Sequence, residues 1–503
     1  MQVATKEYLA EFEALCERRK QEIRNTKDID PREIACITYY VSNDGDDAND
    51  GRTPETAWKT ITKVNEANLR SGDCVRFRRG DLFRGVRVNC KAGVTYTAYG
   101  EGEKPRFYGW KKNLADPDLW FLYDEEHNIW QYMDQIPDCG TLVFNGGEKH
   151  SRKLIPSFIR GRFMCREDES KIFRMEQEMT EDLDIFCNFT GNRTEPPTKG
   201  EKFPVPNMYH GTDGDLFLRC DKGNPGSVFE DIEAITWSSA FCICGNPNVH
   251  IDNVCIKYQN FGITGGGRHE IDSTITNCEI GWIGGCIQSY TGTDPNYPEG
   301  TRGSVTRFGN GIELYGGCDG FTVSNCYVYE VYDAGMSHQV STRANKFVMR
   351  NIKYIDNLIE KCVYGIEYFL DVNPGGEESY MQNLQMSGNV IYDSGYGWGQ
   401  QRHNKHTPAH IKGWSYVNTA SDYRIHDNVF GRAGFRMLHL VAKEPESCPK
   451  MWNNTYIQDL GMTLGQYGYN KEKEPENMVF DEQAEEKIRT VFGEENPTVY
   501  CIK

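Results

Sequence analysis

The sequence predicts a β-solenoid, and two recurring landmarks support this fold class. An asparagine that precedes alternating apolar residues recurs at spacings of 24, 48, 32, 32 and 39 residues, at Asn253, Asn277, Asn325, Asn357, Asn389 and Asn428. A glycine followed by an apolar residue recurs after these positions, at Gly262, Gly285, Gly311, Gly335, Gly365 and Gly434. Repeats of this length mark solenoids, and strand-like segments without helical periodicity make this one a β-solenoid. We expect the six asparagines to form one ladder at an inward turn, in which each amide bonds the next coil.

The N-terminal part of the chain carries an ordered series of strand and turn motifs. Residues 39–61 follow the pattern YYVSxxGxDxxDGxTPxxAWxTI, and residues 71–85 follow SGDxVxFxRGDxFRG. These motifs resemble the first coils of right-handed parallel β-helix proteins of the pectate-lyase-like superfamily, many of which are carbohydrate-active. The resemblance implies an all-β, right-handed parallel β-helix. It does not choose the chemistry, because that superfamily includes lyases, glycosidases and epimerases.

The chain divides into five predicted segments. Residues 1–30 contain an amphipathic helix with Thr5 as N-cap and an apolar face formed by Tyr8, Phe12, Leu15, Cys16 and Ile23. This helix is expected either to cover the open end of the β-structure or to pack on its flank. Residues 31–145 form the first coils and residues 211–460 the main coils, while residues 461–503 form a C-terminal cap. Residues 146–210, rich in charge, Met and Phe, are predicted to be an inserted lid or small subdomain.

Composition limits the classes of binding partner that are expected. The formal net charge of −17 disfavours nucleic acids and anionic membranes as main partners, and 12% aromatic residues suit an oligosaccharide substrate. No apolar signal segment follows Met1, and no run of 18 apolar residues exists, so a cytoplasmic protein is expected. The 18 cysteines are then expected to be reduced and mostly buried. The sequence leaves the oligomeric state open.

The glycine landmarks predict which side chains face outward. The residue after each apolar position should point to solvent because strand side chains alternate, which selects Thr264, Ile287, Glu313, Ser337, Glu367 and Arg436. Glu313 and Glu367 should lie two rungs apart, about 10 Å between backbones. This separation brackets the ~6.5–9.5 Å between the carboxylates of inverting glycosidases and could shrink toward the ~5.5 Å of retaining ones. A register slip of one residue would turn both glutamates inward.

Other residues near these glutamates complete the predicted site. Asp333 and His338 are the further catalytic candidates, although Asp333 also fits a turn role like that of Asp393. Crowded carboxylates beside aromatics push their pKa values apart, as an acid–base pair requires. The residues expected to contact substrate are Tyr315, Ser337, Gln339, Tyr368, Asp371, Trp398 and His403. The three tryptophans Trp282, Trp398 and Trp414 fit sugar stacking and core packing equally well.

No cofactor is expected. His403, His406 and His410 have the spacing H-x2-H-x3-H, but Pro408 interrupts the helix that would align them on zinc. The acidic loop at residues 43–50 lacks the ligand spacing of an EF-hand, so an Asx-rich turn is the preferred interpretation. Calcium elsewhere remains an alternative, since some β-helix lyases use it.

The leading function hypothesis is a glycoside hydrolase acting on oligosaccharides, with exo-action. Glu313 and either Glu367 or Asp333 would act as acid and base or nucleophile, His338 would position one of them, and the insertion would close one end of the groove; intracellular β-helix glycosidases of the xylosidase type are the nearest resemblance. The rival is a polysaccharide lyase or uronate epimerase, whose base would come from Arg343, Lys346, Arg402, Lys405 or His338. A third hypothesis is a non-catalytic carbohydrate-binding solenoid.

Overall fold

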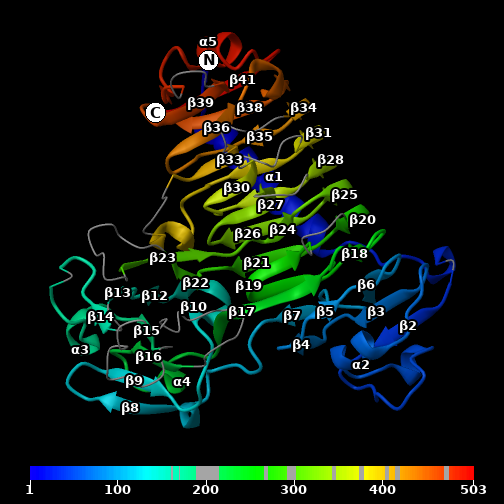
Figure 1. Cartoon of the computed structure of the whole chain (residues 1–503), viewed down its shortest axis with the longest axis vertical. Helices are drawn as coiled ribbons and strands as arrows, with labels where there is room; N and C mark the ends of the chain where they lie inside the picture. Colours follow the sequence, from blue (N-terminus) through cyan, green and yellow to red (C-terminus); the bar gives the residue numbers. More distant parts are fainter. Residues whose placement is uncertain are drawn as a thin grey trace.

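The protein is a right-handed parallel β-helix, as the sequence predicts (Figure 1). The structure, a computed structural model, describes residues 1–34, 36–159, 162–168, 170–188, 214–265, 270–291, 302–342, 347–372, 379–402, 407–413, 420–469 and 475–503. Successive coils stack so that each strand pairs in parallel with the equivalent strand of the next coil, and three strand faces result. One cluster of buried apolar residues extends from Tyr39 in the first coil to Cys501 in the last.

Each face has its own set of strands. The first face consists of β2 (Thr38–Val41), β3 (Cys74–Arg78), β6 (Thr95–Tyr99), β18 (His250–Asp252), β20 (Glu270–Thr276), β25 (Cys318–Ser324), β28 (Val348–Ile355), β31 (Tyr380–Ser387), β34 (Ala420–His426) and β37 (Lys450–Trp452). The second face consists of β4 (Leu82–Arg84), β7 (Arg106–Tyr108), the beginning of β19 (Cys255–Thr264), β21 (Glu279–Ile283), β26 (Tyr327–Val331), β29 (Leu358–Glu360), β32 (Val390–Tyr392), β35 (Val429–Phe430), β38 (Thr455–Asp459) and β41 (Thr498–Ile502). The third face consists of β5 (Val88–Asn89), β17 (Ile232–Cys242), the end of β19, β24 (Ile312–Tyr315), β27 (Ala334–Thr342), β30 (Tyr364–Val372), β33 (Ala409–Gly413), β36 (Arg436–Ala442) and β39 (Thr463–Tyr469).

Close backbone approach explains the glycine landmark on the third face. A Cβ added to Gly262, Gly311, Gly335 or Gly365 would lie 2.3–2.8 Å from the backbone oxygen of the equivalent residue in the next coil. Any side chain there would have to displace backbone, so glycine is required. The landmark fails at its other two predicted members. Gly285 leads into an antiparallel hairpin, and in the coil that contains β36 Leu438, rather than Phe435, pairs with Ile411.

The predicted asparagine ladder is in fact two ladders, one residue apart. Asn357, Asn389 and Asn428, joined by Asn454, form a buried ladder in which each Nδ2 donates to the Oδ1 of the next coil at 2.9–3.0 Å. Asn253, Asn277 and Asn325 instead occupy a turn with φ between 51° and 58°, a conformation that asparagine tolerates better than most residues. Strand register shows the offset: Tyr327 pairs with Leu358, which places Asn325 opposite Asp356.

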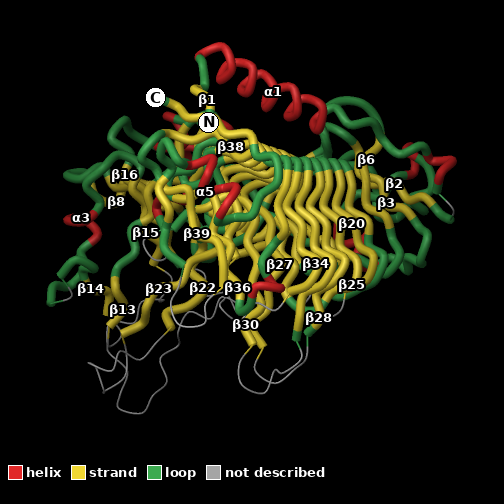
Figure 2. Tube along the Cα trace, turned by 90° about the horizontal axis from the view of Figure 1, so that it is seen from above, coloured by secondary structure: helices red, strands yellow, loops and turns green. Residues whose placement is uncertain are grey.

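The N-terminal helix packs on the flank of the solenoid rather than over its end (Figure 2). Helix α1 (Lys6–Arg24) begins after Thr5, whose side chain accepts from the backbone of Tyr8 as predicted. Its apolar residues, with Cys16 and Ile23 buried, pack on the second face, and Arg24 and Lys20 form ion pairs with Glu279 and Glu360. The strand before it, β1 (Gln2–Val3), pairs with β41, so the first and last strands of the chain close the same end.

The inserted subdomain is larger than the sequence predicts. It begins before residue 146, because β8 (Trp120–Asp124) and β9 (Ile129–Tyr132) already belong to a sheet with β12 (Arg152–Lys153), β15 (Asp184–Asn188) and β16 (Asp215–Arg219). A second sheet contains β13 (Ser157–Ile159), β14 (Arg162–Met164), β22 (Cys286–Thr291) and β23 (Arg302–Phe308), so a hairpin of the solenoid pairs with the insertion. The strand β10 (Cys139–Phe144) and the hairpin strand β11 (Lys149–His150) connect the subdomain to β17. Residues 110–145 resemble further coils in sequence because their strands are as short and apolar as those of the solenoid.

The remaining elements cover the ends and edges. Short helices lie at α2 (Ile61–Glu66), α3 (Met175–Glu178) and α4 (Pro225–Val228). The predicted C-terminal cap still contains two coil strands, β39 and β41. Between them lie β40 (Met478–Val479) and α5 (Ala484–Thr490), whose Ala484 and Ile488 bury against the end of the core. All 18 cysteines are free thiols, and 15 of them are buried. None of the helices described is both long and apolar enough to cross a membrane.

Candidate active site

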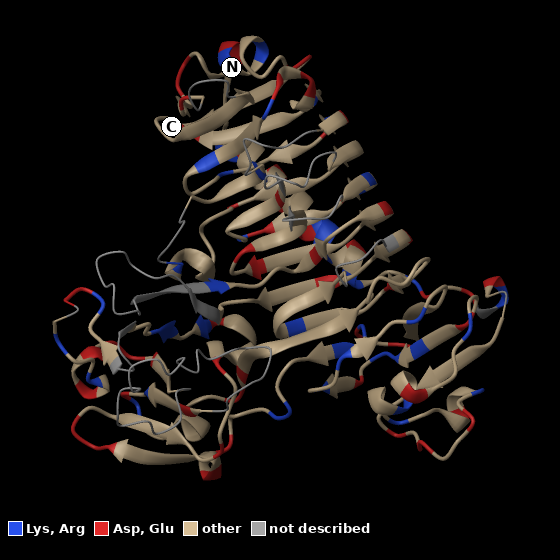
Figure 3. Ribbon diagram, in the orientation of Figure 1, with Lys and Arg blue, Asp and Glu red and all other residues tan. Residues whose placement is uncertain are grey.

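The outward side chains of the third face form one ladder across six coils. Strand register places Thr264, Glu313, Ser337, Glu367, Lys412 and His439 at equivalent positions on consecutive rungs. Glu313 and Glu367 are therefore two rungs apart, about 10 Å between backbones at the usual strand spacing. Their inward neighbours Ile312, Met336 and Ile366 are fully buried, so the predicted direction of both glutamates is the one observed. Figure 3 shows acidic residues on the middle strands of the β-helix and a basic residue nearer its C-terminal end.

Glu313 is a carboxyl group of this ladder whose pKa is strongly shifted. Burial, helped by the charge of nearby Asp333, raises its pKa to about 7, while a hydrogen bond from Asn310 opposes the rise. Asn310 Nδ2 donates to Glu313 Oε2 at 2.6 Å and lies 3.3 Å from Ser337 Oγ. Because Asn310 Oδ1 also accepts from the backbone of Ala334 at 3.0 Å, the amide is held in one orientation between two coils. Glu313 is thus a carboxyl group that exchanges a proton near neutral pH.

Asp333 is buried in an ion pair with Arg402. Its position just before β27 places it one coil from Glu313, and the guanidinium of Arg402 lies 5.5 Å from the centre of the Tyr364 ring. The Lys412 ammonium lies 5.8 Å from the same ring. Asp333 and Asp393 both fit a turn role, but their ion pairs differ. Asp393 pairs with the half-exposed Arg432, whereas Asp333 pairs with the buried Arg402, so a turn role alone does not explain the Asp333 pair.

Two predicted site residues on these strands belong to the core. His338 follows the outward Ser337, so it points inward, is fully buried and stacks on Tyr368 at a ring separation of 5.5 Å. Burial lowers the pKa of His338 to about 3. Tyr368 is inward on the next coil for the same reason. The predictions that His338 is a catalytic residue of the outward face and that Tyr368 contacts substrate are therefore wrong.

Of the three tryptophans considered for sugar stacking, the two that are described pack inside the protein. Trp398 is 2% exposed, donates to the backbone of Glu330 and packs on Tyr332, so it fills space beneath a turn and offers no face to a sugar. Trp282 is buried in the same apolar cluster. Core packing is thus the correct alternative for both, while Trp414 lies outside the described residues.

The other residues predicted to contact substrate lie further along the same strands or outside the described residues. Gln339 is buried and its Nε2 donates to Ser337 Oγ at 3.3 Å, while Tyr315, paired with Gln339, is 39% exposed. Asp371 pairs with Ser341 at the far end of β30, and its side chain lies outside the described part of the protein. His403 lies outside the described residues, as do the lyase candidates Arg343, Lys346 and Lys405.

Sequence reasoning missed several residues of this face. The sequence predicts Ile287 and Arg436 as members of the Glu313 ladder, whereas the structure places Lys412 and His439 on it. Their coils lack the glycine that marks the earlier rungs, because His410 and Met437 occupy its position. Both ladder residues are buried, and His439 has its pKa lowered to about 2 by burial and by the charges of Lys412 and Arg436. Asn310 had a usable signal, since it directly precedes the landmark Gly311.

At the two suggested metal sites, the described side chains contact protein groups. His410 is fully buried and lies 2.9 Å from Ser394 Oγ and 2.7 Å from the Gly431 oxygen, while His403 and His406 lie outside the described residues. In the acidic loop, Asp47 accepts from Thr60 and from the backbone of Lys59, and Asp50 accepts from Thr56 and Arg52. These carboxylates therefore stabilise turns, as the Asx-rich interpretation predicts. Within the described ranges there is no group of three His, Cys, Asp or Glu residues that could hold a metal ion.

Comparison with known proteins adds a short match in sequence and longer matches in structure. No family model matches the chain. Over 77 residues it is 38% identical to a lacto-N-biosidase of Bifidobacterium longum, a match that takes in 13% of this chain and 5% of that protein. The chain thus spans only a small part of this curated relative.

Among solved structures the chain is similar to three carbohydrate-active proteins. The first is XylC in complex with xylose, at 12% identity over 92% of this chain and 83% of that one, with a TM-score of 0.38. Another is a glycoside hydrolase, at 9% identity over 93% and 95% of the two chains, with a TM-score of 0.44. A GH136 lacto-N-biosidase from Eubacterium ramulus matches at 12% identity over 99% and 72%, with a TM-score of 0.28. The likeness is one of fold.

Proposed function

We propose that the protein is a glycoside hydrolase in which Glu313 is the general acid. The observation that carries this proposal is the pKa of Glu313, which burial raises to about 7 on an outward ladder that also holds Glu367 and adjoins Asp333. A general acid works best when its pKa lies near the operating pH. A glycosidase needs one protonated and one ionised carboxyl group on either side of the scissile bond.

Asp333 is the preferred partner carboxylate, and Glu367 is the second candidate. Asp333 is one coil from Glu313 and is held by Arg402, whereas Glu367 is two rungs away with Ser337 between. A closely spaced pair suits direct attack on the sugar, and a wider pair leaves room for a water molecule. Retention or inversion of the anomeric centre therefore reports the separation of the pair that works.

The substrate class proposed is an oligosaccharide cleaved from one end, in the cytoplasm. The short match to a lacto-N-biosidase supports a glycosidase, and the xylosidase-type resemblance of the sequence makes aryl xylosides sensible first probes. We favour hydrolysis over the lyase alternative because, of its candidate bases, His338 is in the core and Arg402 is paired with Asp333.

The test is a comparison of leaving groups in carboxamide variants. Aryl xylosides and aryl lacto-N-biosides with activated (dinitrophenyl) and unactivated (phenyl) leaving groups would be used, with product anomers followed by NMR. Glu313→Gln should lose hydrolysis of the unactivated glycosides by at least a hundredfold and retain most of the activity on activated ones, which need no protonation. Asp333→Asn should lose both.

A matched control separates this role from burial alone. Glu494 also has its pKa raised to about 7 by burial, but it lies in the C-terminal cap, bonded to Tyr456 and Asn454. Glu494→Gln should hydrolyse all substrates like the unmodified protein. If Glu313→Gln behaves like Glu494→Gln, the assignment is wrong. Formation of an unsaturated uronate product, detected by its ultraviolet absorbance, would establish the lyase instead.

A further inference from the structure

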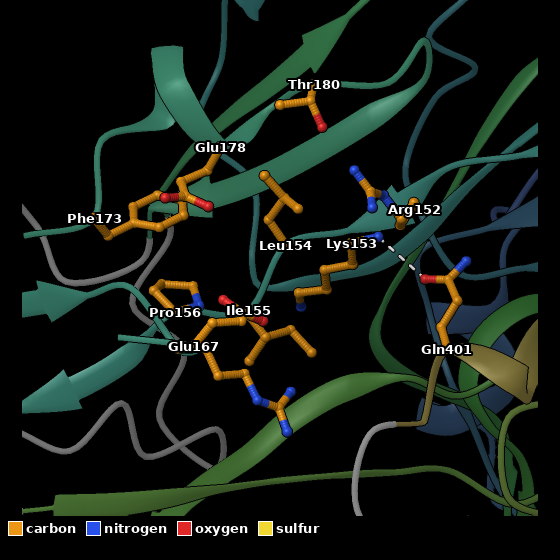
Figure 4. A pocket seen from close by; sticks show the side chains of 11 residues that line it. Arg152, Lys153, Leu154, Ile155, Pro156, Glu167, Phe173, Glu178, Thr180 and Gln401 are labelled. Atoms are coloured by element: carbon orange, nitrogen blue, oxygen red, sulfur yellow. Dashed lines mark hydrogen bonds between the residues drawn. The ribbon is translucent and has the colours of Figure 1, made fainter. Parts of the chain in front are cut away.

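A cavity lies where the inserted subdomain meets the solenoid (Figure 4). Its volume is about 360 Å³, within the range of sites that hold small ligands. Most of its wall comes from the subdomain, including Arg166, Phe173 and Thr180, while Gln401 comes from a turn of the solenoid. The cavity is therefore built by two parts of the chain that are far apart in sequence.

Hydrogen bonds hold the two walls together. Gln401 Oε1 accepts from the backbone of Lys153 at 3.1 Å, and its Nε2 donates to the Ser151 oxygen at 2.8 Å. On the subdomain side, Arg152 is tied to Asp184, and the buried Lys153 to Asp138. The cavity thus has a preformed frame, which reduces the ordering cost of binding.

The groups that remain available inside the cavity are those that bind sugars. Arg166 is exposed and makes no hydrogen bond or ion pair within the described part of the chain. The hydroxyl of Thr180 adds a further donor, and Phe173 supplies an aromatic ring. Glu178 Oε1 accepts from the Cys165 thiol at 3.1 Å, which leaves Oε2 as an acceptor. Planar donors and acceptors beside an aromatic ring suit the hydroxyl groups and apolar face of a pyranose.

Once the paired cations are set aside, the lining of the cavity carries one cation and two carboxylates. Arg152 and Lys153 are neutralised by their own carboxylates, which leaves Arg166 against Glu167 and Glu178 among the lining residues. This arrangement gives no preference for an anionic group. It favours a neutral saccharide.

The cavity adjoins the proposed catalytic carboxylates. Arg402, the residue next to Gln401, forms the ion pair with Asp333. The charge of Arg166 also acts on Tyr332, the residue before Asp333. A ligand that fills the cavity would therefore extend toward Asp333.

We propose that this cavity is a subsite for a further ring of a neutral oligosaccharide whose scissile bond lies at Glu313 and Asp333. The inference rests on the proposed glycosidase function and adds what it leaves open: the enzyme recognises at least two sugar units, and the inserted subdomain supplies the second site. The subdomain is then a specificity element of the β-helix.

The test measures binding rather than turnover. In the full-length Glu313→Gln protein, affinities for xylotriose, lacto-N-tetraose and the monosaccharide xylose would be measured by isothermal titration calorimetry, with and without Arg166→Met or Thr180→Val. The ratio of oligosaccharide to monosaccharide affinity should fall at least tenfold on Arg166→Met and by a smaller factor on Thr180→Val. Lys171→Met is the matched control, because Lys171 is an exposed cation of the same subdomain that pairs with Asp168 and does not line the cavity.

Two results would overturn the subsite. One is an unchanged ratio in Arg166→Met, or an equal change in Lys171→Met. The other is absence of saturable binding by both oligosaccharides. Failure of the proposed function has a separate signature, because it appears as unchanged hydrolysis in Glu313→Gln whatever the binding ratios are. Circular dichroism and thermal midpoints of each variant would confirm that the fold is retained.

Discussion

Replacing Glu313 by glutamine should stabilise the protein at alkaline pH while it removes activity on unactivated glycosides. The pKa of Glu313 is about 7 in the folded protein, against an ordinary value of 4.5 that the unfolded chain is expected to have. A folded-state pKa that is raised makes ionisation oppose folding. The stability that the protonated form supplies is complete below pH 4.5 and is lost as the pH rises through 7.

The magnitude follows from the two pKa values. One pKa unit corresponds to about 1.4 kcal/mol. Relative to low pH, the contribution of Glu313 therefore lowers the free energy of unfolding by roughly 1 kcal/mol at pH 5 and by roughly 3 kcal/mol at pH 8. Glutamine keeps the size and the hydrogen-bonding capacity toward Asn310 but carries no charge. Glu313→Gln should therefore gain roughly 2 kcal/mol more stability relative to the unmodified protein at pH 8 than at pH 5.

The assay is urea denaturation of both proteins at pH 5 and pH 8, followed by fluorescence. Glu279→Gln is the control of opposite sign, because Lys257 and Arg24 lower the pKa of Glu279 to about 2 although burial alone would raise it. Ionised Glu279 stabilises the fold above pH 4.5. Glu279→Gln should therefore lower the free energy of unfolding by a similar amount at pH 5 and pH 8. If Glu313→Gln is destabilised at pH 8, or gains nothing between pH 5 and 8, the reasoning about Glu313 is refuted.

Three further predictions concern residues that support the site and the solenoid. Asn310→Ala removes the hydrogen bond that opposes the rise in the Glu313 pKa, so the alkaline limb of kcat/KM against pH should move upward by about one to two pH units; a downward shift would contradict the geometry. Trp398→Ala should lower the stability by about 3–5 kcal/mol, as for a buried core aromatic, measured by urea denaturation; a raised KM at unchanged stability would instead indicate a sugar platform. Asn389→Ala should lower the free energy of unfolding several times more than Asn325→Gly, both measured by urea denaturation. The first variant leaves buried groups unsatisfied, at about 1–3 kcal/mol for each lost bond, whereas the second keeps the left-handed turn and loses one part-buried bond. Equal losses in the two variants would argue against separate ladders.

Strand alternation is a local property, and it made the directions of Glu313 and Glu367 predictable. The same alternation should have excluded His338 and Tyr368, since each follows an outward residue directly. The sequence places them close to the glutamates, but closeness along a strand is not closeness on one face. Their burial shows that on a solenoid the parity of the position decides between core and site.

Other features depended on contacts between distant coils. Lys412 and His439 join the ladder through register with Glu367, although loops of unequal length separate these coils in sequence. Arg402 reaches Asp333 from a turn 69 residues later. Neither pairing leaves a local pattern, because loop length determines where a coil returns and the sequence does not show where each loop folds.

The sequence by itself determined the β-helix, the capped N-terminal helix and the outward face that carries Glu313 and Glu367. These follow from turn chemistry, strand alternation and helix capping, all of which act over a few residues. Only the tertiary structure decided that the helix packs on the flank, that the asparagines form two ladders, and that the subdomain shares a cavity with the solenoid. It also decided that Glu313 exchanges its proton near pH 7, because desolvation depends on which coils surround a carboxyl group and that is settled when the coils stack.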